Sequence, residues 1–160
     1  MLTRRGFLGW TAGALASGGS LLNAHVGQAL EVPFAVVVSR KSPILQLSRR
    51  ELTQLYLGLE VQAPGGERIL ALHQMPQSGE RIGFERQVAG LLPGCSSERR
   101  LCDDAVAPPA VTSVRALQHM VHHRVRAVGY VRGDQVGPEL RVIPIDGSLP
   151  GDHDYPLRAA

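Results

Sequence analysis

The chain has 160 residues, of which 44% are hydrophobic and 19% are charged, and its mean hydropathy is -0.01. This is the size of one ordinary domain with enough apolar material for a core, which excludes a disordered chain. The formal net charge is +3, but sixteen of the seventeen basic residues are arginine and they form no polybasic block. Aromatic residues make up only 4%. We therefore expect no nucleic-acid partner, because both the usual phosphate-backbone patch and a set of stacking rings are missing from the sequence.

The first 29 residues have the layout of an export signal. Arg4 and Arg5 give a positively charged start, a mildly apolar stretch rich in glycine and alanine covers residues 10–22, and small residues follow at Ala24 and Ala29. The apolar stretch is too short to span a bilayer, and the arginine pair resembles a twin-arginine export signal. We expect export to the periplasm and cleavage after Ala29 or Ala24. The alternative interpretation is an amphipathic first helix of the fold.

Removal of residues 1–29 changes both the charge and the setting of the cysteines. The remaining 131 residues contain 15 basic and 14 acidic side chains, a net charge of +1. Cys95 and Cys102 would then lie in an oxidising compartment, where an even number of cysteines predicts a disulfide. Redox-active cysteines more often have the C-x-x-C spacing, and two cysteines alone do not make a metal site. We predict a structural disulfide between them.

The first elements of residues 30–160 are a strand and a capped helix. Residues 32–39 form a continuous apolar, β-branched run, which predicts a central strand covered on both faces. Ser48 and Glu51 have the spacing of a capping box, and Gly58 can end the helix that follows. The apolar face of this helix is predicted at Leu52, Leu55, Tyr56 and Leu59.

The middle of the chain predicts a turn, a strand, a helix and an irregular segment. Residues 63–66 form the turn and residues 68–73 the strand. A helix begins at Ser78 and presents Phe84, Val88 and Leu91 on one face. Residues 93–110 contain glycine, proline, serine and both cysteines, and are predicted to be irregular.

The last third predicts one helix and two strands. The helix begins near Thr112 or Ser113, and the strands cover residues 127–131 and 140–145. The apolar face of this helix contains Val114, Leu117 and Val121. The alternation of strands and helices predicts an α/β fold with a mainly parallel sheet flanked by helices and joined by right-handed crossovers.

Four stretches, in order along the chain, match one protein family. They are the strand, Ser-Pro turn and capped helix of residues 36–58, Ser-Gly-Glu-Arg at 78–81, Ala-Val-Gly-Tyr-Val at 127–131, and Ile-Asp-Gly at 145–147 with Tyr-Pro-Leu at 155–157. Together they resemble phosphate ABC-transporter substrate-binding proteins. The resemblance implies that residues 30–160 form one lobe of a type 2 periplasmic binding protein-like fold. It also implies binding of a small phosphate-like anion, or an accessory role in a phosphate-type ABC transport system.

Residues 78–81 are the candidate anion site. A Ser-Gly pair at a helix start offers unpaired backbone N–H groups, a hydroxyl and the positive end of the helix dipole. The resemblance implies that Ser78, Gly79, the amide of Glu80 and Arg81 bind a tetrahedral oxyanion. The alternative interpretation is that Ser78 is only an N-cap and Arg81 pairs with Glu85 at the i, i+4 spacing.

The chain departs from this family in two ways. Glu80 stands where the family has threonine, so a carboxylate replaces a hydroxyl donor beside the proposed anion. The family fold has two lobes, whereas 131 residues supply one, and the family's phosphate site draws donors from both. A single lobe would present an open half-site that a second copy of the chain, a membrane transporter or another periplasmic protein would cover. An alternative function is therefore a protein-interaction module that keeps the fold without binding a ligand.

Other candidate groups are weaker. His119 and His123 share a helix face with the spacing of two metal ligands, next to His122, but two ligands do not make a site, and we predict no metal or other cofactor. Asp103 and Asp104 are adjacent carboxylates of the kind that are usually solvated, and no Gly-x-Ser-x-Gly nucleophile motif is present. We expect a protein that is not an enzyme.

Overall fold

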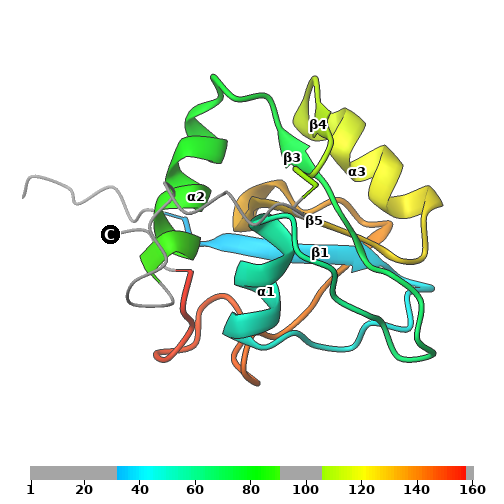
Figure 1. Ribbon diagram of the computed structural model, residues 1–160. Helices are drawn as coiled ribbons and strands as arrows, with labels where there is room; N and C mark the ends of the chain where they lie inside the picture. Colours follow the sequence, from blue (N-terminus) through cyan, green and yellow to red (C-terminus); the bar gives the residue numbers. More distant parts are fainter. Residues whose placement is uncertain (1–31, 91–105, 158–160) are drawn as a thin grey trace, which may run out of the picture.

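The structure is a computed structural model that describes residues 32–90 and 106–157. Its elements in chain order are β1 (Phe34–Ser39), α1 (Arg49–Tyr56), β2 (Leu70–Ala71), β3 (His73–Gln74), α2 (Gly79–Gly90), β4 (Ala110–Val111), α3 (Val114–His123), β5 (Ala127–Arg132), the 3-10 helix η2 (Gly133–Gln135) and β6 (Leu140–Val142). Figure 1 shows β1 running through the middle of the molecule, with the helices on either side. The predicted α/β class and the flanking helices are confirmed.

The pairing of the strands corrects the expected mainly parallel sheet. The four-stranded sheet has the order β2-β5-β1-β6, and a separate parallel pair joins β3 to β4. β1 pairs antiparallel with both β5 and β6, whereas β2 pairs parallel with β5. The sheet is therefore mixed, because β2, β5 and β6 run in one direction and β1 lies between two of them in the other. Alternating elements in the sequence could not reveal where β1 inserts.

β1 separates two apolar layers, as expected for a strand covered on both faces. Phe34, Val36 and Val38 belong to the layer that contains the buried side chains of α1 and α2. Ala35 and Val37 belong to the opposite layer, which contains Leu117 and Val121 from α3. The alternation follows from the two-residue period of a strand. The predicted central strand is confirmed.

The predicted start and end of α1 are also confirmed. The Ser48 hydroxyl accepts the amide N–H of Glu51 at 3.2 Å, and the Glu51 carboxylate accepts the amide N–H of Ser48 at 2.8 Å. These two bonds satisfy donors that a helix start leaves unpaired. After the last residue, Tyr56, the chain reaches Gly58 with a φ of +84°, in the left-handed region. Leu59 therefore follows the helix and does not extend its apolar face.

The predicted strand at residues 68–73 divides into two short strands. β2 joins the main sheet and β3 pairs with β4, so the chain changes sheets at the fully buried Leu72. A continuous apolar run gives no sign of such a change. The irregular segment predicted at 93–110 ends in β4, a two-residue strand that no sequence pattern indicates.

The other predicted elements appear close to their expected positions. The turn at 63–66 contains Gly65 and Gly66, both with positive φ. α3 begins after Ser113, whose hydroxyl accepts the amide N–H of Ala116 at 3.1 Å. β5 matches its prediction within one residue, and β6 is shorter than predicted.

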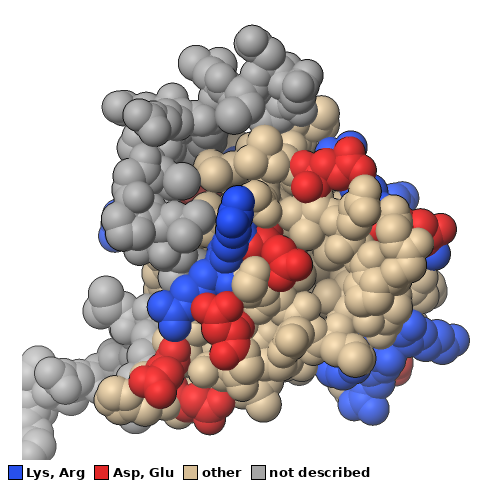
Figure 2. Space-filling model, turned by 60° about the horizontal axis from the view of Figure 1, so that its bottom comes forward, with Lys and Arg blue, Asp and Glu red and all other residues tan. Residues whose placement is uncertain are grey.

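Several predictions lie outside the described residues. They concern the export signal at 1–29, the Cys95–Cys102 disulfide, the carboxylates of Asp103 and Asp104, and Leu91. None of the described helices is long and apolar enough to cross a membrane. Figure 2 brings the bottom of Figure 1 forward and shows basic and acidic side chains interspersed over the middle of that face, with a group of basic side chains at its lower right.

Candidate anion-binding site

The four residues of the candidate site lie together at the start of α2. The Ser78 amide donates to the carbonyl of Met75 at 3.0 Å, which closes the turn before the helix. The Ser78 hydroxyl then accepts the amide N–H of Arg81 at 3.2 Å. Ser78 is therefore an N-cap. This role does not exclude a ligand contact, because a serine hydroxyl can donate its own hydrogen while it accepts another.

Gly79 leaves the backbone at the helix start accessible. A Cβ atom added there would meet no heavy atom within 4 Å, so packing does not require glycine at this position. The first N–H groups of an α-helix have no acceptor within the helix, and the helix dipole places a partial positive charge beside them. The amides of Gly79 and Glu80 are therefore the donors at this helix start that an approaching anion would meet.

The side chain of Arg81 extends toward Glu85, one turn further along the helix, and toward β3. Its Nε donates to Oε1 of Glu85 at 2.9 Å, and its Nη1 donates to the carbonyl of Gln74 at 3.2 Å. The alternative i, i+4 pairing with Glu85 is thus present in the structure. A guanidinium has five N–H donors, so these two contacts do not exhaust its capacity. A ligand at the helix start would compete with Glu85 for this cation.

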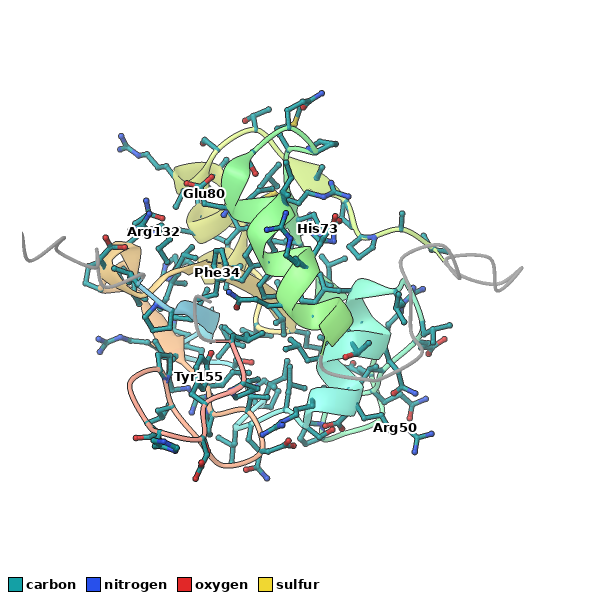
Figure 3. All side chains as sticks on the ribbon, turned by 90° about the vertical axis from the view of Figure 1, so that its left-hand side faces the viewer. Phe34, Arg50, His73, Glu80, Arg132 and Tyr155 are labelled. Carbon is teal, nitrogen blue, oxygen red and sulfur yellow. The ribbon has the colours of Figure 1, made fainter. Side chains whose placement is uncertain are left out.

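The carboxylate of Glu80 adds a negative charge to the proposed anion site. Figure 3 shows Glu80 at the N-terminal end of α2, in the first helical turn. A carboxylate in this position interacts favourably with the helix dipole. The same carboxylate repels a negatively charged ligand at this helix start, so Glu80 disfavours the binding of phosphate here.

Two residues behind the site were not predicted as part of it. His73 is only 2% exposed, and its Nδ1 lies 3.1 Å from the hydroxyl of Tyr130. Its Nε2 lies 3.7 Å from Oε1 of Glu85, the same oxygen that binds Arg81. Burial raises the pKa of the Tyr130 hydroxyl well above its ordinary value, so this group stays protonated. The sequence places His73 and Tyr130 in predicted strands, and Tyr130 also in the family-like stretch 127–131, without relating either residue to the anion site.

An aromatic cluster fixes α2 against the sheet. The rings of Phe84 and Tyr130 stack with their centroids 3.6 Å apart, and Phe34 and Tyr56 meet both rings edge-on. Stacked and edge-to-face rings stabilise a contact beyond the area that they bury. The cluster therefore determines where the N-terminal end of α2, and with it the candidate site, lies relative to β5.

The histidines of α3 lie apart from this site. The ring centroids of His119 and His123 are 4.4 Å apart, and His123 lies 4.7 Å from His122. Within residues 32–90 and 106–157, no group of three or more potential metal-binding side chains is arranged to hold an ion.

Comparison with known proteins identifies the fold. The sequence matches no protein-family model and no curated protein. An ABC-type phosphate transport receptor from Vibrio cholerae matches 78% of this chain with a TM-score of 0.64 and 24% identity. A Clostridium perfringens protein named as a phosphate ABC transporter substrate-binding protein, solved with bound phosphate, matches 74% with a TM-score of 0.59 and 17% identity. PstS from Borrelia burgdorferi also matches 74%, with a TM-score of 0.58 and 13% identity.

The fold is that of part of a phosphate-transport receptor. The match covers 53% of the Vibrio protein, 46% of the Clostridium protein and 49% of the Borrelia protein. The chain thus spans about half the length of the structures that it resembles. At this level of identity the likeness concerns the backbone.

Proposed function

We propose that this chain is an exported solute-binding protein that binds a small phosphate-like oxyanion at the start of α2 and serves a phosphate-type ABC transport system. The observation that carries the proposal is the accessible Ser78-Gly79 helix start, with Arg81 beside it, in a fold shared with phosphate-transport receptors. The role is binding and delivery rather than catalysis.

The contacts of the site support a specific division of roles. The amides of Gly79 and Glu80 and the hydroxyl of Ser78 donate to the oxygens of the anion. Arg81 supplies charge and further N–H donors after its contact with Glu85 loosens. The chain acts as one lobe, residues 30–160, and a second copy or a transporter subunit covers the ligand.

Calorimetric titration of the purified chain with phosphate, sulfate and a small carboxylate tests the anion site. We expect heat of binding with at least one anion, and Arg81→Ala to weaken that binding about tenfold or more, because a charge-assisted hydrogen bond is lost. The matched control is Arg86→Ala, which removes an exposed arginine from the same helix and should leave the affinity unchanged.

The outcome that contradicts the proposal is equally specific. The proposed anion site would be disproved by an absence of heat with all three anions. It would also be disproved if the Arg81→Ala variant and the parent chain bound the anion with equal affinity. Glu80→Thr provides a test of the opposite sign. It deletes a negative charge and adds a hydroxyl donor, so we expect it to strengthen phosphate binding.

Export is tested by locating the protein in cells and measuring its mass. We expect periplasmic protein that begins at residue 30 or residue 25, with Cys95 and Cys102 protected from alkylation until a reductant is added. Replacement of both Arg4 and Arg5 by lysine should block export if the arginine pair is read as a signal. Free thiols in periplasmic material would disprove the disulfide, and full-length protein in the cytoplasm would disprove export.

A further inference from the structure

A second cavity, separate from the anion site, lies at the start of α1. Its volume is about 670 Å³, within the range of small-molecule sites. The fold brings the walls together from three parts of the chain, and the lining residues are Ile44, Gln46, Leu47, Ser48, Glu51, Gln62, Ala63, Pro64, Ile69, Asp146 and Gly147. Figure 3 shows Arg50, at the start of α1, and Glu80, at the start of α2, in widely separated parts of the molecule. The cavity is therefore not an extension of the proposed anion site.

The floor of this cavity is apolar. It is formed by Ile44, Leu47, Ala63 and Ile69, each of which is buried. Because apolar atoms at the base of a cavity gain from contact with a hydrocarbon group, the floor favours a ligand with an apolar body.

Backbone hydrogen bonds fix the walls before any ligand arrives. The amide of Leu47 donates to the carbonyl of Pro144 at 3.1 Å, and the amide of Asp146 donates to the carbonyl of Leu47 at 3.0 Å. On the opposite wall, the amide of Ile69 donates to the carbonyl of Val61 at 2.9 Å. A preformed cavity lowers the entropy cost of binding.

The charged side chains that line the cavity have one sign. Among the described residues that line the cavity, the charged side chains are the carboxylates of Glu51 and Asp146, and no basic side chain lines it. Each carboxylate already accepts hydrogen bonds from the protein, but its two oxygens offer about four acceptor positions. Arg49 pairs with Asp146 at 2.8 Å without lining the cavity, so it reduces the negative charge and does not reverse it.

Three backbone N–H groups at the helix start beside this cavity already have acceptors within the protein. The amide of Glu51 donates to the Ser48 hydroxyl, the amide of Ser48 to Glu51, and the amide of Arg49 to Asp146 at 3.1 Å. These N–H groups, which would otherwise attract an anion, are occupied by oxygens of the chain itself. The remaining polar side chains of the lining are the two carboxylates, which only accept hydrogen bonds, and the amides of Gln46 and Gln62, which can donate or accept them.

We propose that this cavity binds a small organic amine, with its hydrocarbon part on the apolar floor and its ammonium group between the carboxylates of Glu51 and Asp146. An ammonium group carries three N–H donors and a positive charge, which the carboxylates match. This site is independent of the anion site at α2.

Titration of the full chain with cadaverine, followed by calorimetry and by NMR of the Ile44 and Ile69 methyl groups, tests the proposal. Pentanediol and glutarate have the same carbon chain with neutral and negative ends. We expect cadaverine to bind more tightly than either and to shift both methyl resonances. Equal responses to cadaverine and glutarate, or unchanged methyl resonances, would overturn the proposal.

Two conservative variants test whether the two carboxylates bind the amine. Glu51→Gln keeps the capping box, since glutamine also serves there, and Asp146→Asn keeps a residue type that tolerates the φ of 50°. We expect each to weaken cadaverine binding about fivefold, the effect of losing one partly exposed charge contact. Circular dichroism confirms folding. Unchanged cadaverine affinity in both folded variants would overturn the site, whereas Arg81→Ala should leave cadaverine binding intact, whatever its effect on phosphate.

Discussion

Replacement of Tyr130 by alanine is expected to lower the free energy of unfolding by about 4 kcal/mol, as for other large buried aromatic residues. Tyr130 is fully buried, and its ring stacks on Phe84 at 3.6 Å. The variant would leave a cavity between β5 and α2 and would remove the edge contacts of Phe34 and Tyr56. Urea unfolding followed by circular dichroism measures the change.

Tyr130→Phe separates the ring from the hydroxyl. It keeps the aromatic packing and removes the oxygen that lies 3.1 Å from Nδ1 of His73 and accepts the amide N–H of Gln74 at 3.4 Å. We expect a loss of about 1–2 kcal/mol, the usual effect of leaving a buried polar group without its partner. If both variants lost equal stability, the ring packing would contribute little and the account of the aromatic cluster would be wrong.

Replacement of Gly58 by alanine is expected to destabilise the protein by about 3 kcal/mol, for two additive reasons. Gly58 has a φ of +84°, which an L-residue with a side chain adopts at a cost. A Cβ atom there would also lie 2.6 Å from the carbonyl oxygen of Val106, closer than atoms approach without a shift of the backbone. Thermal or urea unfolding gives the difference.

Gly66→Ala is the matched control for this prediction. Gly66 has nearly the same φ, +82°, but an added Cβ would meet no heavy atom within 4 Å. We expect a loss of only about 1 kcal/mol there, the contribution of the backbone conformation alone. Equal effects at Gly58 and Gly66 would show that the approach of Val106 does not constrain the end of α1.

The helix starts were predictable from the sequence because their causes are local. Ser48 and Glu51 form a capping box through residues three positions apart, and Ser78 and Ser113 cap their helices over the same short span. The side-chain period that buries Leu117 and Val121 is also a local property. Such features depend on neighbouring residues and require no knowledge of the partner elements.

The candidate site was predictable in part. The sequence indicated that Ser78, Gly79, Glu80 and Arg81 begin a helix, and it left open whether Arg81 pairs with Glu85. The structure shows that pairing and adds the carbonyl of Gln74 as a second partner. His73 and Tyr130 reach the back of the site from different strands, and no spacing along the chain relates them.

By itself the sequence determined the order of the three helices and of β1, β5 and β6, the capped helix starts and the apolar run that becomes β1. Only the tertiary structure decided that β1 lies antiparallel between β5 and β6, and that residues 68–73 divide between two sheets. It alone also assembled the cavity at α1 from three distant segments. The physical reason is range: capping and periodicity act within a few residues, whereas strand pairing and cavity walls depend on contacts between residues tens of positions apart.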